Sequence, residues 1–185
     1  MSTCDRQLCL SLTAICVFAD RFHVQTAYRD LIEMYAAPYN IHPALVASII
    51  RNKSSFRAEA ESAVGGARGL MQLTPELAEW IAKQAHFGDY SFDSIFDPET
   101  NINLGCWYLG YLSYLFDGDI VSIVAAYHAG QGQVKQWLAD PSMTDDGKTL
   151  SAEKLPDGPT KSYVERVIRD FEIYKEIYFN DVNPG

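Results

Sequence analysis

Four polar side chains in three separate segments could do chemistry in this chain: Lys53, Gln72, Tyr127 and His128. A lysine ammonium titrates near 10.4, so acid–base work at neutral pH requires its pKa to fall by about 3 units, or roughly 4 kcal/mol. Burial can shift a lysine that far. An amide such as that of Gln72 donates and accepts hydrogen bonds, and a histidine adds a titration near about 6.5. The sequence therefore offers one candidate acid–base group and several hydrogen-bonding groups, which the fold must bring together.

The segments around these residues resemble one known family. Residues 49–56 read Ile-Ile-Arg-Asn-Lys-Ser-Ser-Phe, residues 66–72 read Gly-Ala-Arg-Gly-Leu-Met-Gln, and residues 125–130 read Ala-Ala-Tyr-His-Ala-Gly. In order and spacing they resemble the soluble lytic transglycosylase domain, a lysozyme-like family that cleaves the glycan strands of bacterial peptidoglycan. The resemblance covers about residues 25–178. It implies cleavage of the β-1,4 bond between MurNAc and GlcNAc to a 1,6-anhydro product, by a single glutamate that acts first as acid and then as base.

Lys53 occupies the position that this family gives to its catalytic glutamate. A cation about 4 Å from a developing oxocarbenium ion repels it by a few kcal/mol at an effective dielectric constant of about 20, whereas a carboxylate attracts it. We therefore expect the usual activity to be lost, unless Glu59 or Glu61 on the following loop replaces the acid. Those two glutamates are otherwise solvated surface charges. The leading hypothesis is a lytic transglycosylase whose activity is in doubt, and the alternative is a catalytically inactive module that binds glycan strands. An all-α interaction protein without a sugar function is a weaker third hypothesis.

The resemblance also implies a set of substrate-binding residues. Ser62 matches a serine near the acid and the acetyl group of the substrate, with a plain loop serine as the alternative. Gln72 offers its amide to the sugar or to the acid. Tyr127 matches the tyrosine whose hydroxyl faces the acid, and a core tyrosine is its alternative. His128 stands where the family usually has asparagine, as a replacement polar contact or a tolerated change. Tyr163 is expected to form a wall of the sugar-binding groove.

Two further segments can be compared with the family: the loop before Gln72, which differs in length, and residues 101–105, which match. The doubled glycine Gly65-Gly66 lengthens that loop by one residue relative to the family, which can move Ser62 or Gln72 out of line for catalysis. Asn101–Gly105 resembles the Asn-Ile-x-x-Gly segment of the family, in which the glycine permits close helix approach. We interpret that segment as structural.

Apolar residues recur at three- and four-residue spacing along most of the chain, which predicts helices. Capping residues and prolines mark several helix starts. We expect helices near residues 28–37, 43–55, 75–84, 98–116, 120–129, 134–138 and 163–174, with loops at 57–69 and 139–160. Strand signals are almost absent. The sequence thus predicts an all-α fold. The resemblance implies one lysozyme-like domain of the goose-type or lytic transglycosylase kind, with the long helix at its centre and a groove for glycan.

Composition narrows the possible partners. The 185 residues are 48% hydrophobic, enough for one domain with a core, and 15 basic against 24 acidic residues give a formal charge of -9. That charge argues against nucleic acid, whose partners usually carry a basic patch. No pair of histidines or cysteines has metal-ligand spacing, so we expect no metal and no cofactor. Peptidoglycan strands are the expected partner, and nothing requires more than a monomer.

The first 24 residues read as a leader, and residues 25–180 as the lytic transglycosylase-like domain. An apolar run from Leu8 to Ala19 is too short to span a bilayer as a helix. It fits the hydrophobic part of a secretory signal or a degraded anchor, although an incidental apolar leader is the alternative. Any membrane contact is expected only through this leader. The expected location is therefore extracytoplasmic, secreted or associated with the cell envelope.

Overall fold

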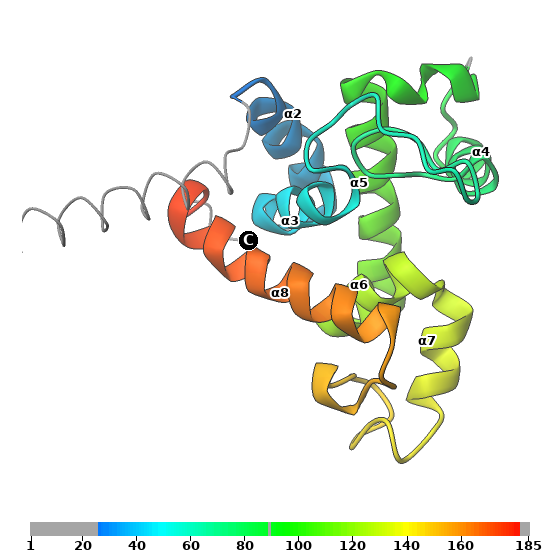
Figure 1. Cartoon of the computed structure of the whole chain (residues 1–185), viewed down its shortest axis with the longest axis vertical. Helices are drawn as coiled ribbons and strands as arrows, with labels where there is room; N and C mark the ends of the chain where they lie inside the picture. The colour runs from blue at the N-terminus through cyan, green and yellow to red at the C-terminus, as the bar shows by residue number, and fades with distance from the viewer. Residues whose placement is uncertain (1–25, 89, 182–185) are drawn as a thin grey trace, which may run out of the picture.

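The computed structural model describes residues 26–88 and 90–181, with side chains from Tyr28 onward (Figure 1). The proposed leader lies outside the described residues. The described chain is all-α, as the sequence predicted. Its α-helices are α2 (Thr26–Ala36), α3 (Pro43–Ser54), α4 (Pro75–Gln84), α5 (Pro98–Leu115), α6 (Ile120–Ala129), α7 (Gln131–Leu138) and α8 (Pro159–Tyr178). Short 3-10 helices lie at Ala37–Tyr39, Phe92–Phe96 and Ala152–Lys154. None of the described helices is both long and apolar enough to cross a membrane.

The helix starts follow the capping signals of the sequence. The Thr74 hydroxyl accepts a hydrogen bond from the backbone N–H of Leu77 at 3.3 Å before α4. The Asp97 carboxylate accepts a hydrogen bond from the backbone N–H of Thr100 at 2.9 Å before α5. Each of these two bonds satisfies an N–H group that the first turn of a helix otherwise leaves without a partner. α8 begins at Pro159, a few residues earlier than expected. Proline suits the first turn of a helix, because its missing N–H has no partner there in any case.

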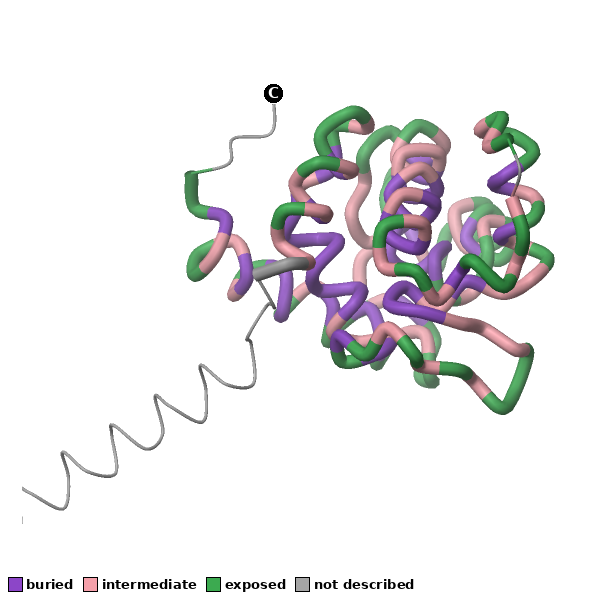
Figure 2. The backbone as a smooth tube through the Cα atoms, turned by 90° about the horizontal axis from the view of Figure 1, so that it is seen from above, coloured by how far each residue is buried: buried purple, intermediate pink, exposed green. Residues whose placement is uncertain are grey.

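The long helix α5 is central, with α2, α4 and α6 packed against it, while α8 packs against α3 and α6 (Figure 1). Buried residues concentrate where these helices face one another, and the exposed ones lie on the outer turns and loops (Figure 2). Ile102, Leu109 and Leu112 on α5 are fully buried. Removing such side chains from water is the main stabilising contribution to the fold.

The loop between α3 and α4 is anchored on α5. Leu70 and Met71 are fully buried, as expected. A Cβ on Gly105 would lie 2.1 Å from the sulfur of Met71, so only glycine lets the loop come this close to the helix. The loop thereby connects the end of α3 to α5.

Candidate active site

Lys53 lies in the last turn of α3, as the sequence predicted. Its side chain is partly buried, and its Nζ lies 4.9 Å from the ring centre of Tyr163 and 5.5 Å from that of Tyr127. Aromatic ring faces are electron-rich and attract a cation at such distances. Burial lowers the pKa of Lys53 to about 8, while the two ring faces favour its charged form. The amine is therefore a cation at neutral pH.

Tyr127, His128 and Tyr163 surround this amine from two helices. Tyr127 and His128 come from α6 and Tyr163 from the first half of α8. The His128 ring stacks on the Tyr163 ring at 4.7 Å, and its Nδ1 lies 3.0 Å from the Thr160 hydroxyl. Loss of water around its ring lowers the pKa of His128, and the positive charges of Lys53 and Arg166 lower it further. The imidazole is thus neutral at pH 7, which leaves the lysine as the cation of this group.

Both tyrosine hydroxyls are unsuited to act as acids. Burial raises the pKa of Tyr127 well above its usual value and also raises that of Tyr163. The Tyr127 hydroxyl donates a hydrogen bond to the backbone carbonyl of Met71 at 2.9 Å, so the ring rather than the hydroxyl faces the lysine. The Tyr163 hydroxyl is buried and has no hydrogen-bond partner among the described residues.

No carboxylate contacts Lys53 within the described part of the chain. Glu61 is exposed and pairs instead with Arg68, its Oε1 lying 2.9 Å from the arginine Nε. Glu59 is exposed on the same loop. Neither glutamate is positioned by an observed contact to serve as an acid beside Lys53.

Ser62 and Gln72 hydrogen-bond to their own loop. The Ser62 hydroxyl donates to the carbonyl of Val64 at 2.8 Å, within the turn that contains Gly65-Gly66. The Gln72 Nε2 donates to the carbonyls of Ala60 and Gly69, both at 2.9 Å. Both N–H groups of this amide are therefore occupied. Only its carbonyl oxygen is free to accept a hydrogen bond from a ligand.

A buried amide on α5 fixes this loop beneath the candidate site. The Asn101 Oδ1 accepts from the backbone N–H of Met71 at 2.7 Å, and its Nδ2 donates to the carbonyls of Arg68 and Ile95 at 3.1 and 2.9 Å. A Cβ on Gly69 would lie 2.1 Å from that nitrogen. Because Met71 in turn accepts the Tyr127 hydroxyl, Asn101 indirectly positions the ring that faces Lys53. The structural interpretation of this asparagine agrees with these contacts.

Because the Lys53 amine is buried, we expect the free energy of unfolding of the protein to depend on pH. Between its folded pKa of about 8 and its ordinary value of 10.5, the unfolded chain binds more protons at Lys53 than the folded chain does. The cost of burying the cation is therefore fully present below pH 8 and disappears toward pH 10.5. Lys53→Met should be more stable than the wild type by about 2 kcal/mol at pH 7. This difference should shrink above pH 8.

Urea unfolding at several pH values measures this difference. The same substitution at the exposed Lys135 on α7 corrects for pH effects outside the site. A difference between Lys53→Met and the wild type that stays constant from pH 7 to 10.5 would show that Lys53 titrates as it does in the unfolded chain.

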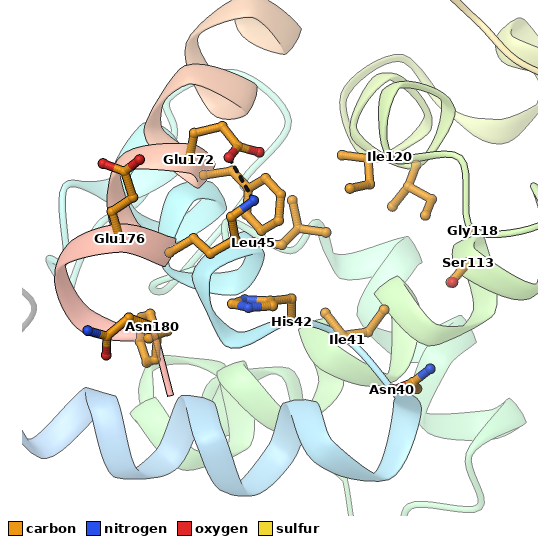
Figure 3. Close-up of a pocket in the computed structure, with 14 residues that line it drawn as sticks. Asn40, Ile41, His42, Leu45, Ser113, Gly118, Ile120, Glu172, Glu176 and Asn180 are labelled. Atoms are coloured by element: carbon orange, nitrogen blue, oxygen red, sulfur yellow. Dashed lines mark ion pairs between the residues drawn. The ribbon is translucent and has the colours of Figure 1, made fainter. Parts of the chain in front are cut away.

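A cavity of about 730 Å³ lies at the opposite end of α3 from Lys53. Figure 3 shows residues from the start of α3, the turn before α6 and the second half of α8 around it, with Lys175 and Glu172 forming an ion pair. Its lining includes Leu45, Ile123 and Phe171 and is mainly apolar. Within the described ranges, no group of three or more histidine, cysteine, aspartate or glutamate side chains could hold a metal ion.

Comparison with known proteins assigns this all-α domain to a family. The family model of the transglycosylase SLT domain matches residues 30–149, and the chain belongs to this family. The soluble lytic murein transglycosylase of Escherichia coli K12 is 33% identical over 156 residues, which cover 84% of this chain and 24% of that protein. The membrane-bound lytic murein transglycosylase C of Edwardsiella ictaluri is 30% identical over 116 residues, which cover 58% of this chain and 32% of that protein.

Solved structures give the same family. The 70 kDa soluble lytic transglycosylase of Escherichia coli matches with a TM-score of 0.77 and 31% identity, over 90% of this chain and 26% of that one. The Pseudomonas aeruginosa lytic transglycosylase Slt matches with a TM-score of 0.74 and 33% identity, over 84% of this chain and 25% of that one. The latter structure is of an inactive glutamate-to-glutamine mutant. This chain spans about a quarter of the length of these soluble relatives.

Sequence reasoning did not single out the arginines beside the site. Arg51 on α3 and Arg166 and Arg169 on α8 line a second, polar pocket together with Asn52 and Asp170. A signal was present, since Arg166, Arg169 and Asp170 recur at the spacing of one helical face. The sequence does not show which residues of α3 these α8 side chains lie beside, because that depends on how the two helices pack.

Proposed function

We propose that this protein binds the glycan strands of peptidoglycan outside the cytoplasm and does not cleave them by the usual lytic mechanism. The observation that carries the proposal is the Lys53 ammonium, which is held between two tyrosine rings with no carboxylate in contact among the described residues. By resemblance, this is the position of the acid that protonates the leaving oxygen. Aromatic rings and hydrogen-bonding groups around it can still contact a sugar.

The charge of the amine opposes the chemistry more than its pKa does. The transition state of glycoside cleavage resembles an oxocarbenium ion. An ammonium at about 4 Å from that ion destabilises it by a few kcal/mol at an effective dielectric constant of about 20. Deprotonating Lys53 removes the repulsion, but it also removes the proton that the leaving group requires. One group cannot supply both a proton and a stabilising negative charge.

Retained lytic cleavage, with Lys53 as the proton donor, is the second candidate function. The specific observation in its favour is the lysine pKa of about 8, which lies within reach of general acid catalysis near neutral pH. In that case, cleavage should fall as the pH rises through this value, because the deprotonated amine has no proton to donate. The repulsion described above makes it the weaker candidate.

Incubation with purified peptidoglycan sacculi tests the proposal. The protein should sediment with the sacculi, and mass spectrometry should detect no 1,6-anhydro muropeptides in the supernatant. The soluble lytic murein transglycosylase of Escherichia coli, added to the same sacculi, is the positive control for cleavage. Release of anhydro products by this protein would overturn the non-lytic proposal. Failure to sediment without any release would overturn glycan binding itself.

A further inference from the structure

The pocket between the last turn of α3 and the middle of α8 combines several positive charges. Its volume is about 230 Å³, and its lining residues are Arg51, Asn52, Ser55, Arg166, Arg169 and Asp170. Three arginines and one aspartate thus line the pocket, an excess of two positive charges, in a protein whose formal charge is -9. This concentration of arginines is opposite in sign to the rest of the molecule.

The single carboxylate of the pocket is already engaged. The buried Asp170 accepts a hydrogen bond from Asn52 Nδ2 at 2.8 Å and lies 3.7 Å from the Nε of Arg169. Asn52 also accepts a bond from the Nε of Arg166 at 3.3 Å. No carboxylate contact is observed for Arg51 or Arg166 in the described part of the chain. Their remaining N–H groups are available for an anion from outside, for which a guanidinium offers a planar set of donors.

The pocket adjoins the candidate active site. Asn52 and Lys53 are neighbours in sequence, so their side chains leave α3 about 100° apart. Arg166 is close enough to both side chains for its positive charge to lower the pKa of His128 further and to oppose the rise that burial gives the pKa of Tyr163. A ligand that lies on Lys53 and the two tyrosines can therefore place a substituent over the arginines.

We propose that Arg51, Arg166 and Arg169 form a subsite for a carboxylate of the peptide stem that is attached to the muramic acid of the glycan strand. The inference rests on the proposed glycan binding, which it makes specific for strands that carry stems. Peptide stems end in carboxylates, whereas the sugar backbone is neutral. The subsite therefore separates stem-bearing peptidoglycan from other N-acetylated glycans.

Calorimetric titration with two soluble ligands tests this subsite: a muramyl disaccharide with its peptide stem, and a chitin oligosaccharide without one. The stem-bearing ligand should lose about tenfold in affinity in the double variant Arg51→Gln/Arg169→Gln, corresponding to one charge-assisted hydrogen bond. Binding of the chitin oligosaccharide should be unchanged. Arg29→Gln is the control outside the pocket, because it removes an arginine and its ion pair with Glu33 on α2. Amidating the stem carboxylates should reproduce the loss in the wild type.

The outcomes separate this inference from the proposed function. Equal binding of both ligands, or a double variant that behaves like Arg29→Gln, would overturn the subsite while leaving glycan binding intact. If neither ligand binds, the free stem peptide is titrated while the arginine side-chain NMR signals are followed. Shifts in these signals would support the carboxylate subsite without glycan binding, and their absence would overturn both ideas. Displacement of the stem peptide by an equal concentration of inorganic phosphate would also overturn it, because the pocket would then bind any anion.

Discussion

Lys53→Glu is expected to turn this protein into an active lytic transglycosylase. The new carboxylate would lie at the end of α3 beside the rings of Tyr127 and Tyr163, where Lys53 now lies. Partial burial there should raise the glutamate pKa toward neutral, which the acid step requires. The same carboxylate would attract the oxocarbenium ion that the ammonium repels. A general acid or base of this kind contributes on the order of 10² to 10⁴-fold to a rate.

The measurement is the rate of release of 1,6-anhydro muropeptides from sacculi, compared among the wild type, Lys53→Glu and Lys53→Gln. Glutamine removes the positive charge without supplying a proton donor, so Lys53→Gln should remain inactive. If it were as active as Lys53→Glu, loss of repulsion alone would explain the gain. If Lys53→Glu folds and binds sacculi but releases nothing, the defect lies elsewhere, with the lengthened turn at Gly65-Gly66 as the first place to test.

Asn101→Leu is expected to have the largest effect on stability. The substitution keeps the size of the side chain but removes the partners of three backbone groups, the N–H of Met71 and the carbonyls of Arg68 and Ile95. Buried groups left without partners each cost about 1 to 3 kcal/mol, so we expect a loss of about 4 kcal/mol in the free energy of unfolding. The loop between α3 and α4 should detach from α5 first.

Urea unfolding gives the loss directly, and hydrogen exchange at Met71 reports on the loop. Asn103→Leu is the matched control, because Asn103 lies two residues further along α5, is only partly buried and makes no observed hydrogen bond through its side chain. If the free energy of unfolding of Asn101→Leu were as high as that of Asn103→Leu, the role assigned to the Asn101 amide would be contradicted. If Asn101→Leu does not fold, Asn101→Asp, which keeps only the acceptor, provides an intermediate case.

Much of the fold could be predicted from the sequence, because the signals are local. The caps at Thr74 and Asp97 mark helix starts through hydrogen bonds that span three residues. Pro43 marks another start, because a proline needs no partner for an N–H in the first turn. The start of α8 was missed by a few residues. It follows an irregular segment, where no apolar periodicity precedes Pro159.

The candidate site was only partly predictable. The resemblance selected Lys53, Tyr127, His128 and Tyr163, and these four residues do lie together. It also suggested that the Tyr127 hydroxyl faces the acid position and that the Gln72 amide bonds to the sugar or to the acid. In the structure the hydroxyl bonds to Met71 and the Gln72 nitrogen to two loop carbonyls. A motif specifies which residue is present, but the direction of each polar atom depends on which backbone group lies within reach.

The sequence by itself determined the helices and the family, because both are written in residue types and short spacings. It also singled out Lys53 as the residue around which the expected site is built. Only the tertiary structure decided what surrounds that lysine. Residues separated by more than a hundred positions, such as Lys53 and Tyr163, meet because α8 packs against α3. The same packing places three arginines around one pocket. Burial and the field of neighbouring charges set the chemistry of a side chain, and both are properties of the packed helices rather than of any one segment.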